Sequence, residues 1–250
     1  MRKFISVGIF LVLATFTFGV AEAAELRVLI TNGMKPVMTE VAAQFERSSG
    51  HKLSIRYEGS AILQQEITRG DAFDVAMLIA SNMDAVAKLD KIAAATRVNV
   101  ARSGLGMVVR AGQPKPDIST VDAFKRAMLD AKSIAYVTKG ASGVHFIAVC
   151  ERLGIAEQVK AKGKTLPTGT VAEFVANGEA ELAIQQKSEL ASLKGTDLLG
   201  PLPPEVDLIS LIAAAASAST KESDAAKAFI KFFATPDVIT VIKAKGMDPA

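Results

Sequence analysis

The chain has 250 residues, of which half are apolar, 22% are charged and 6% are aromatic. This length and apolar content are enough to bury a large core, which excludes an intrinsically disordered protein. The 29 basic side chains nearly balance the 26 acidic ones, no run of five like charges occurs and tryptophan is absent, so nucleic acid, sugars and quaternary ammonium compounds are disfavoured as ligands.

The first 23 residues have the pattern of an export signal. Arg2 and Lys3 precede an apolar run at residues 4–20, and Ala21-Glu22-Ala23 has the small-x-small form of a cleavage site. The alternative is an uncleaved membrane anchor, which the marginal length of the run disfavours. We predict cleavage after Ala23. This leaves 227 residues with 27 basic and 25 acidic side chains, a net charge of +2, once Arg2, Lys3 and Glu22 are removed.

The first part of the exported chain alternates short apolar runs with segments of helical periodicity. We predict strands at residues 26–30, 53–57 and 74–79, and helices at residues 36–49 and 61–69. Gly50 and Gly70 follow the helices, where a left-handed residue ends a helix well. Three strand-loop-helix cycles predict an α/β domain.

The second part repeats this alternation. We predict strands at residues 98–101, 104–110, 133–137, 181–184 and 208–216, and helices at residues 121–130, 143–153, 223–233 and 236–245, with a short helix after Thr170. Ser119 is the predicted cap of the helix at 121–130, and Thr170 with Glu173 forms a predicted capping box. The polar turn at residues 112–116 is a candidate crossover between two domains.

Small polar residues follow the predicted strands in four loops, at residues 31–33, 59–60, 139–143 and 168–170. In open α/β sheets, ligands bind where the carboxyl ends of strands lead into helix N-termini, because free N–H donors and the positive end of the helix dipole meet there. Such loops predict a site for a small anion. The alternative is that these residues only cap helices.

The motifs of common hydrolases and kinases are missing. His51 and His145 do not form a zinc-binding His-Glu-x-x-His pattern, and residues 140–144 lack the last glycine of a nucleophile elbow. Residues 163–165 do not complete a phosphate loop, because position 158 is Gln where that motif needs Gly. We therefore expect no enzyme, no metal and no cofactor. Cys150 is the only thiol, so no internal disulfide forms, and its apolar surroundings predict a buried structural residue.

Several segments resemble one known family. These are residues 26–30, the helix at 36–50, Ser60 with the Leu63-Gln64-Gln65-Glu66-Ile67 run, and Gly70-Asp71-Ala72-Phe73-Asp74-Val75. They are similar to the molybdate-binding family among the solute-binding proteins of ABC importers, over most of residues 25–248. The resemblance implies the α/β type II periplasmic binding protein fold: two lobes, each a mixed, mainly parallel sheet flanked by helices, with the ligand cleft between them.

The division of the chain follows from the same resemblance and from the order of the predicted elements. After the signal peptide at residues 1–23, the first lobe comprises residues 24–101 and 208–250, and the second comprises residues 102–207. Family members close their two lobes on a tetrahedral oxyanion, which serine hydroxyls, backbone N–H groups and a tyrosine hold.

Carried over position by position, the resemblance places the ligand-binding residues at Asn32, Gly33, Ser60, Ala61, Ser142, Gly143, Val171 and Gln186. Gly33 stands where the family has a serine, and Asn32 is the substitute donor. Gln186 stands where the family has a tyrosine. An amide both donates and accepts hydrogen bonds, whereas a dehydrated dianion needs donors only, so these changes favour a small organic acid over molybdate or tungstate. The candidate cations for the charge of the ligand are Lys139, Arg102 and Arg56.

The resemblance implies a periplasmic protein that captures a small anion, either an oxyanion such as molybdate or tungstate or a small organic acid. The protein would deliver this ligand to an ABC permease in the inner membrane. We expect a monomer that binds no nucleic acid. An exported enzyme and a sensory adaptor that presents its ligand to a receptor are the alternatives, because one fold supports many functions.

Overall fold

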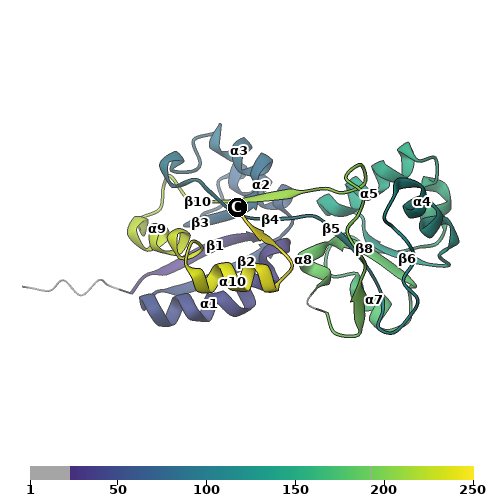
Figure 1. Cartoon of the computed structure of the whole chain (residues 1–250). Helices are drawn as coiled ribbons and strands as arrows, with labels where there is room; N and C mark the ends of the chain where they lie inside the picture. Colours follow the sequence, from purple (N-terminus) through teal and green to yellow (C-terminus); the bar gives the residue numbers. More distant parts are fainter. Residues whose placement is uncertain (1–22, 192) are drawn as a thin grey trace, which may run out of the picture.

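The computed structural model describes residues 23–191 and 193–250, which form two lobes that lie side by side (Figure 1). Each lobe holds one mixed β-sheet with helices packed on it, as predicted. Residues 1–22 of the predicted export signal lie outside the described residues. In the described part of the chain, no helix is both long and apolar enough to cross a membrane.

The first lobe is built on a six-stranded sheet with the order β11-β4-β10-β3-β1-β2. Strand β1 pairs in parallel with β2 and β3, whereas β10 runs antiparallel between β3 and β4. The strands are β1 (Glu25–Thr31), β2 (Lys52–Glu58), β3 (Val75–Ile79), β4 (Val98–Ser103), β10 (Ser210–Ala216) and β11 (Asp248–Pro249). Around them lie α1 (Lys35–Ser49), α2 (Ser60–Arg69), α3 (Ala80–Ala87), α9 (Ser223–Phe232), α10 (Pro236–Ala244) and the 3-10 turns η1 (Asn32–Met34) and η2 (Ala94–Thr96).

Both faces of this sheet are covered. On one face, alternate residues of β1 pack with α1, α9 and α10 in a core where the rings of Phe45 and Phe229 meet edge to face at 4.9 Å. On the other face, Leu29 and Leu78 pack with α2 and α3. Burial on two sides explains why the central strands are nearly continuous apolar runs rather than alternating ones.

The second lobe is built on a five-stranded sheet with the order β7-β6-β8-β5-β9. Strand β6 pairs in parallel with β7 and β8, and β5 runs antiparallel to β8 and β9. The strands are β5 (Leu105–Arg110), β6 (Ile134–Val137), β7 (Gly163–Leu166), β8 (Leu182–Gln186) and β9 (Thr196–Leu198); the helices are α4 (Val121–Asp130), α5 (Ala141–Arg152), α6 (Ala156–Ala161), α7 (Ala172–Ala176) and α8 (Lys187–Leu190). Cys150 is buried in this core, as predicted, and burial raises the pKa of its thiol to about 12.

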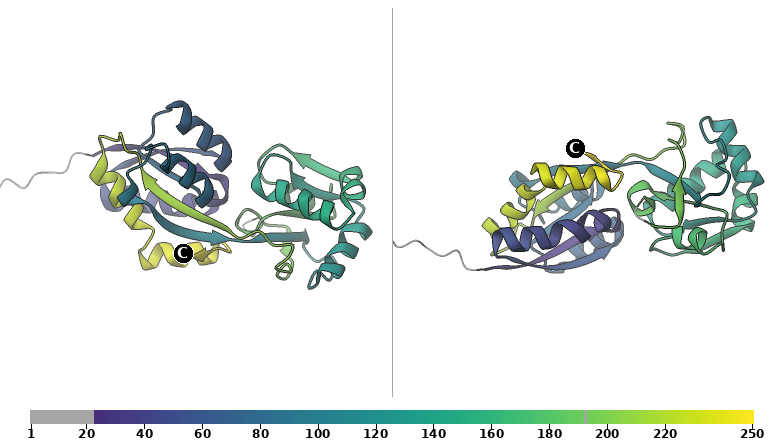
Figure 2. Two further views of the ribbon diagram at one scale, coloured as in Figure 1. Left: turned by 90° about the horizontal axis from the view of Figure 1, so that it is seen from above. Right: turned by 60° about the horizontal axis from the view of Figure 1, so that its bottom comes forward.

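Two segments join the lobes, and Figure 2 shows them running together between the two sheets. Gly104 alone separates β4 in the first sheet from β5 in the second, and residues 207–209 return the chain to β10. One oxygen of Asp207, Oδ1, accepts hydrogen bonds from the N–H groups of Leu105 (2.6 Å) and Leu208 (2.7 Å), so this carboxylate links the two segments. The lobe boundaries given above stay a prediction.

Three local predictions were wrong. The turn at residues 112–116 is not a crossover, because it follows β5 inside the second lobe. The cap of α4 is Thr120 rather than Ser119, and its Oγ1 accepts the N–H of Ala123 (3.1 Å). The capping box of Thr170 is not formed, since α7 begins at Ala172 without a side-chain cap. Sequence analysis also missed the strands β7, β9 and β11 and the helices α3, α6 and α8. All of them are short, and the three strands are not fully buried.

Candidate ligand-binding site

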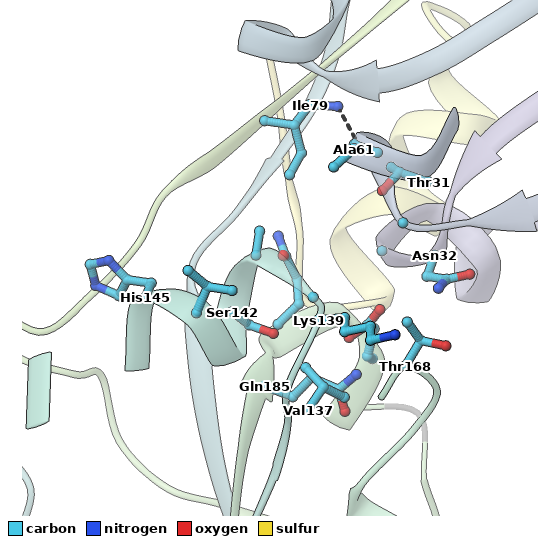
Figure 3. Close-up of a pocket in the computed structure, with 18 of the residues that line it drawn as sticks. Thr31, Asn32, Ala61, Ile79, Val137, Lys139, Ser142, His145, Thr168 and Gln185 are labelled. Atoms are coloured by element: carbon cyan, nitrogen blue, oxygen red, sulfur yellow. Dashed lines mark hydrogen bonds between the residues drawn. The ribbon is translucent and has the colours of Figure 1, made fainter. Parts of the chain in front are cut away.

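A cleft of about 540 Å³ lies between the lobes, at the edge where the parallel strands of both sheets end (Figure 3). Its volume is within the range of about 300–1,000 Å³ that is typical of small-molecule sites. Both lobes contribute to its walls. The lining residues are Thr31, Asn32, Gly33, Gly59, Ser60, Ala61, Ile62, Ile79, Asn82, Val137, Lys139, Gly140, Ala141, Ser142, Val144, His145, Ala148, Thr168, Gly169, Gln185, Gln186, Glu189 and Leu208.

The wall from the first lobe follows the carboxyl ends of β1, β2 and β3. The buried Ser60 opens α2, and its Oγ accepts a hydrogen bond from the N–H of Ile79 (2.9 Å) at the end of β3 (Figure 3). This bond uses a lone pair of the hydroxyl, so its proton is left for a ligand. The first N–H groups of α2 also lack partners within the helix and carry the positive end of its dipole. This wall therefore offers several hydrogen-bond donors to an anion.

The wall from the second lobe follows β6. The helix α5 begins at Ala141, and the buried Ser142 faces the cleft beside the exposed Lys139. Gly143 allows this arrangement, since a Cβ on this residue would overlap the carbonyl oxygen of Val137. The absence of a side chain lets the first turn of α5 rest against the end of β6.

Two neighbouring glutamines at the end of β8 have different partners. Gln186 donates from Nε2 to the carbonyl of Ser103 (3.2 Å) and lies opposite Gly33, whose Cβ, if present, would be 3.7 Å from Gln186 Cδ. Gln185 accepts the N–H of Val171 at Oε1 (3.1 Å) and donates from Nε2 to the carbonyl of Gly169 (2.7 Å). Gln185 therefore holds the loop before α7, and Gln186 fills the space next to the missing side chain of residue 33.

Six of the eight predicted site residues line the cleft: Asn32, Gly33, Ser60, Ala61, Ser142 and Gln186. Gly143 and Val171 are buried and are not among the lining residues, and the N–H of Val171 is already bonded to Gln185. That these eight residues bind a ligand stays a prediction.

Of the three candidate cations, only Lys139 lines the cleft. Arg56 instead forms an ion pair with Glu66, with Nη2 2.5 Å from Oε1, and Arg102 Nε lies 3.8 Å from Asp248 Oδ2. The sequence alone could not tell which of these three residues faces the cleft, because it does not show which basic side chains meet an acidic partner after folding.

Three of the described residues that line the cleft have titratable side chains: Lys139, His145 and Glu189. Lys139 forms no ion pair with another described residue. His145 lies with Nε2 2.9 Å from the carbonyl oxygen of Val206, so this nitrogen carries a proton and donates it. Burial raises the pKa of Glu189 to about 7, against a hydrogen bond from Gln185 that lowers it. The cleft thus combines a cation, a bonded imidazole and a carboxyl group that titrates near neutrality.

Sequence analysis missed Glu189 as a site residue, together with Asn82 and Gln185, whereas Thr31 and Thr168 lie in two of the predicted loops. The predicted strand ended at residue 184, whereas β8 continues to Gln186 and leads directly into α8. The position of Glu189 in the chain could have identified it, because residues that follow a parallel strand lie at the edge of the sheet where ligands commonly bind. In the described part of the chain, no three His, Cys, Asp or Glu side chains come close enough to hold a metal ion.

Over residues 26–248 the sequence matches the family described as bacterial extracellular solute-binding protein. It is 31% identical to an aconitate isomerase of a Pseudomonas species, across 98% of this chain and 95% of that protein. It is also 28% identical to the molybdate-binding protein ModA of Azotobacter vinelandii, across 90% of each chain. The solved periplasmic molybdate-binding protein of Azotobacter vinelandii superposes with a TM-score of 0.72 at 19% identity, covering 89% of this chain and 98% of that one. All of these matches extend over both lobes.

Proposed function

The chain belongs to the bacterial extracellular solute-binding proteins, and from this premise we propose that its cleft captures a small organic acid with more than one carboxylate. The observation that carries this proposal is the mixed polarity of the cleft. Lys139 and the hydroxyls of Ser60 and Ser142 suit carboxylates, whereas the amide of Gln186 and the carboxyl of Glu189 also present oxygen acceptors. An organic acid that keeps one carboxyl proton, or that carries a hydroxyl group, donates to these acceptors while its carboxylates accept from the donors.

A bare tetrahedral oxyanion suits this lining less well. Gly33 has no hydroxyl to donate, and each lost hydrogen bond to a charged group is worth about 1.5–3 kcal/mol. We therefore expect this cleft to bind molybdate and tungstate more weakly than organic acids, although the molybdate-binding protein ModA is a relative.

Aconitate is the first organic acid to test. It is a six-carbon tricarboxylate, and it is named in the relative that matches 98% of this chain. Its carboxylates suit Lys139 and the hydroxyl donors, and its carbon chain suits the apolar part of the lining, which includes Leu208 and the 60% exposed Val144.

We further propose that the protein works in the periplasm, after removal of residues 1–23, as a monomer that delivers its ligand to an ABC permease of the inner membrane. The family, the signal pattern and the two-lobed fold support this role. Closure of the lobes would bend the chain at Gly104 and at residues 207–209, because ligand contacts from both walls favour the closed form.

A thermal-shift panel tests the proposed ligand class. The purified protein is heated with cis-aconitate, trans-aconitate, citrate, acetate, molybdate, tungstate, sulfate or phosphate. Binding to the native state at a hundred times the Kd stabilises it by about 2.7 kcal/mol, so we expect a rise of several degrees in Tm with at least one tricarboxylate. A rise with molybdate or tungstate, and with none of the organic acids, would contradict the proposal.

Replacing Ser60 with alanine is expected to weaken the binding of a carboxylate ligand by about tenfold to a hundredfold, because one donor to a charged group is lost. It also removes the acceptor of the Ile79 N–H, so a lower Tm is expected as well. Calorimetric titration well below both melting temperatures separates the two effects. Ser223→Ala, on the exposed start of α9, is the matched control. An unchanged affinity of Ser60→Ala shows that Ser60 does not contact the ligand.

A second candidate function is isomerisation of an unsaturated carboxylic acid, which the aconitate isomerase of Pseudomonas favours as a relative over nearly the full length of this chain. Proton NMR of cis-aconitate or trans-aconitate incubated with the protein distinguishes the two functions. A transport protein binds one equivalent and leaves the ligand unchanged, whereas an isomerase converts many equivalents of either isomer to the same equilibrium mixture.

A further inference from the structure

Glu189 is the one carboxyl group among the described residues that line the cleft. It lies on α8 at a point where the lobes touch, because the hydroxyl of the neighbouring Ser188 donates to the carbonyl oxygen of Gly33 in the first lobe (2.9 Å). Glu189 also borders a smaller groove of about 260 Å³ that shares Asn32 and Gly169 with the cleft. Glu189 therefore sits between the two lobes.

The titratable groups that line these two cavities with Glu189 come from four other elements or loops. Lys35 on α1 and Glu173 on α7 line the smaller groove, and Lys139 and His145 line the cleft. Partial burial disfavours the ionised form of Glu189 and brings its pKa to about 7. At neutral pH the group is thus present both as a carboxylate, which accepts a proton, and as an acid, which returns one.

We propose that Glu189 transfers the proton in an isomerisation of an unsaturated carboxylic acid bound in the cleft. This inference rests on the second function proposed above and names the residue that performs it. The geometry behind it is the placement of Glu189, the one carboxyl group among the described lining residues, in an interlobe cleft that also holds Lys139, which pairs with no acidic side chain in the described part of the chain.

The step requires no metal, oxidant or reductant. The substrate has a methylene group next to a carbon–carbon double bond, as aconitate does. A carboxylate oxygen of Glu189 removes one methylene proton, so a C–H bond breaks and an O–H bond forms. The electron pair left on this carbon forms a new double bond to the central carbon, and the electrons of the old double bond move onto its far carbon and the carboxylate attached there. Glu189 then returns the proton to that far carbon.

The other two titratable groups of the cleft suit this role less well. Lys139 is exposed and lacks an ion-pair partner in the described chain, so it is suited to holding the carboxylate that takes up negative charge. His145 already donates its Nε2 proton to the carbonyl of Val206, near the segment that joins the lobes. Among the described residues that line the cleft, Glu189 alone has a carboxylate oxygen that can take up a proton.

The variant Glu189→Gln tests the proposal. It keeps the size of the side chain and removes the exchangeable acid, so we expect turnover of cis-aconitate and trans-aconitate to fall by about a hundredfold or more. Binding, measured by thermal shift at pH 8, is expected to persist or strengthen, because a repelling charge has been removed. Glu179→Gln, exposed on the second lobe and not lining the cleft, is the matched control and keeps wild-type turnover. Glu189→Asp retains a carboxylate and is expected to recover part of the activity.

Two measurements distinguish a proton-transferring group from a merely structural one. While Glu189 holds the proton, its O–H group exchanges with solvent in part of the turnovers, so in deuterium oxide the wild type is expected to introduce deuterium at the substrate carbons, and Glu189→Gln is not. The wild-type rate is also expected to rise with pH through about 7, as Glu189 ionises, whereas the residual rate of Glu189→Gln lacks this limb.

The outcomes separate this inference from the proposed function. If no organic acid in the panel binds, both fail. If aconitate binds to the wild type but is neither isomerised nor exchanged with deuterium, the binding function stands and the role of Glu189 is refuted. If the wild type isomerises aconitate and Glu189→Gln does so equally fast, isomerisation stands and another group moves the proton.

Discussion

Gly143→Ala is expected to destabilise the protein by about 3 kcal/mol or more, although alanine is the better helix former by about 1 kcal/mol. The reason is the close approach of α5 to β6. The new Cβ would overlap the carbonyl oxygen of Val137, and neither backbone segment yields without moving the helix away from the sheet. Such a shift displaces Ser142, so the fraction of the variant that still folds is expected to bind its ligand more weakly.

Chemical denaturation followed by circular dichroism checks this prediction. The control is Gly59→Ala at the N-cap of α2 in the first lobe, where an added Cβ meets nothing within 4 Å. The control is expected to change the free energy of unfolding by less than about 1 kcal/mol. A similar small effect at Gly143 would mean that α5 does not pack against β6 as described.

Asp207→Ala is expected to destabilise the protein by about 2–4 kcal/mol and to loosen the connection between the lobes. One carboxylate oxygen receives both the Leu105 and the Leu208 N–H groups, and hydrogen bonds to charged groups are worth about 1.5–3 kcal/mol each. The carboxylate also occupies the space beside Gly104, where a Cβ would lie 2.7 Å from Asp207 Oδ2. The Asp207 side chain and the absence of a side chain at Gly104 together allow the two crossover segments to lie close to each other.

Hydrogen exchange is the measurement for this variant. The amides of Leu105 and Leu208 are expected to exchange faster in Asp207→Ala than in the wild type, whereas amides in the centre of either sheet change only as far as global stability falls. Asp207→Asn keeps one acceptor oxygen without the charge and is expected to give an intermediate result. Equal exchange at both amides in all three proteins would show that Asp207 does not link the crossover segments.

Much of the fold was predictable because the physics behind it is local. The apolar runs at residues 26–30 and 53–57 became β1 and β2, and Gly50 and Gly70 end α1 and α2 in left-handed conformations. Each of these signals lies within one element and depends on its own periodicity or backbone preference. Short elements such as α8 carry too few turns for a periodic pattern, and this is why they were missed.

The sequence predicted at which edge of the sheets the candidate site lies, but not all of the residues that line it. Parallel strands that lead into helices bring their carboxyl ends together, so the loops at residues 31–33, 59–60, 139–143 and 168–170 were expected to meet, and residues of all four line the cleft. The two glutamines at the end of β8 could not be told apart in the same way. Gln186 faces Gly33, whereas Gln185 holds a loop 14–16 residues away in the sequence.

The sequence by itself determined the order of the longer elements and the family, and it predicted the edge of each sheet where a ligand would bind, because these depend on neighbouring residues and on chain direction. Only the tertiary structure decided which charges reach the cleft. It pairs Arg56 with Glu66 and leaves Lys139 facing the cavity, and it buries Glu189 enough to bring its pKa to about 7. The physical reason is that burial and long-range pairing depend on segments that meet only after folding, such as Ser188 and Gly33, 155 positions apart.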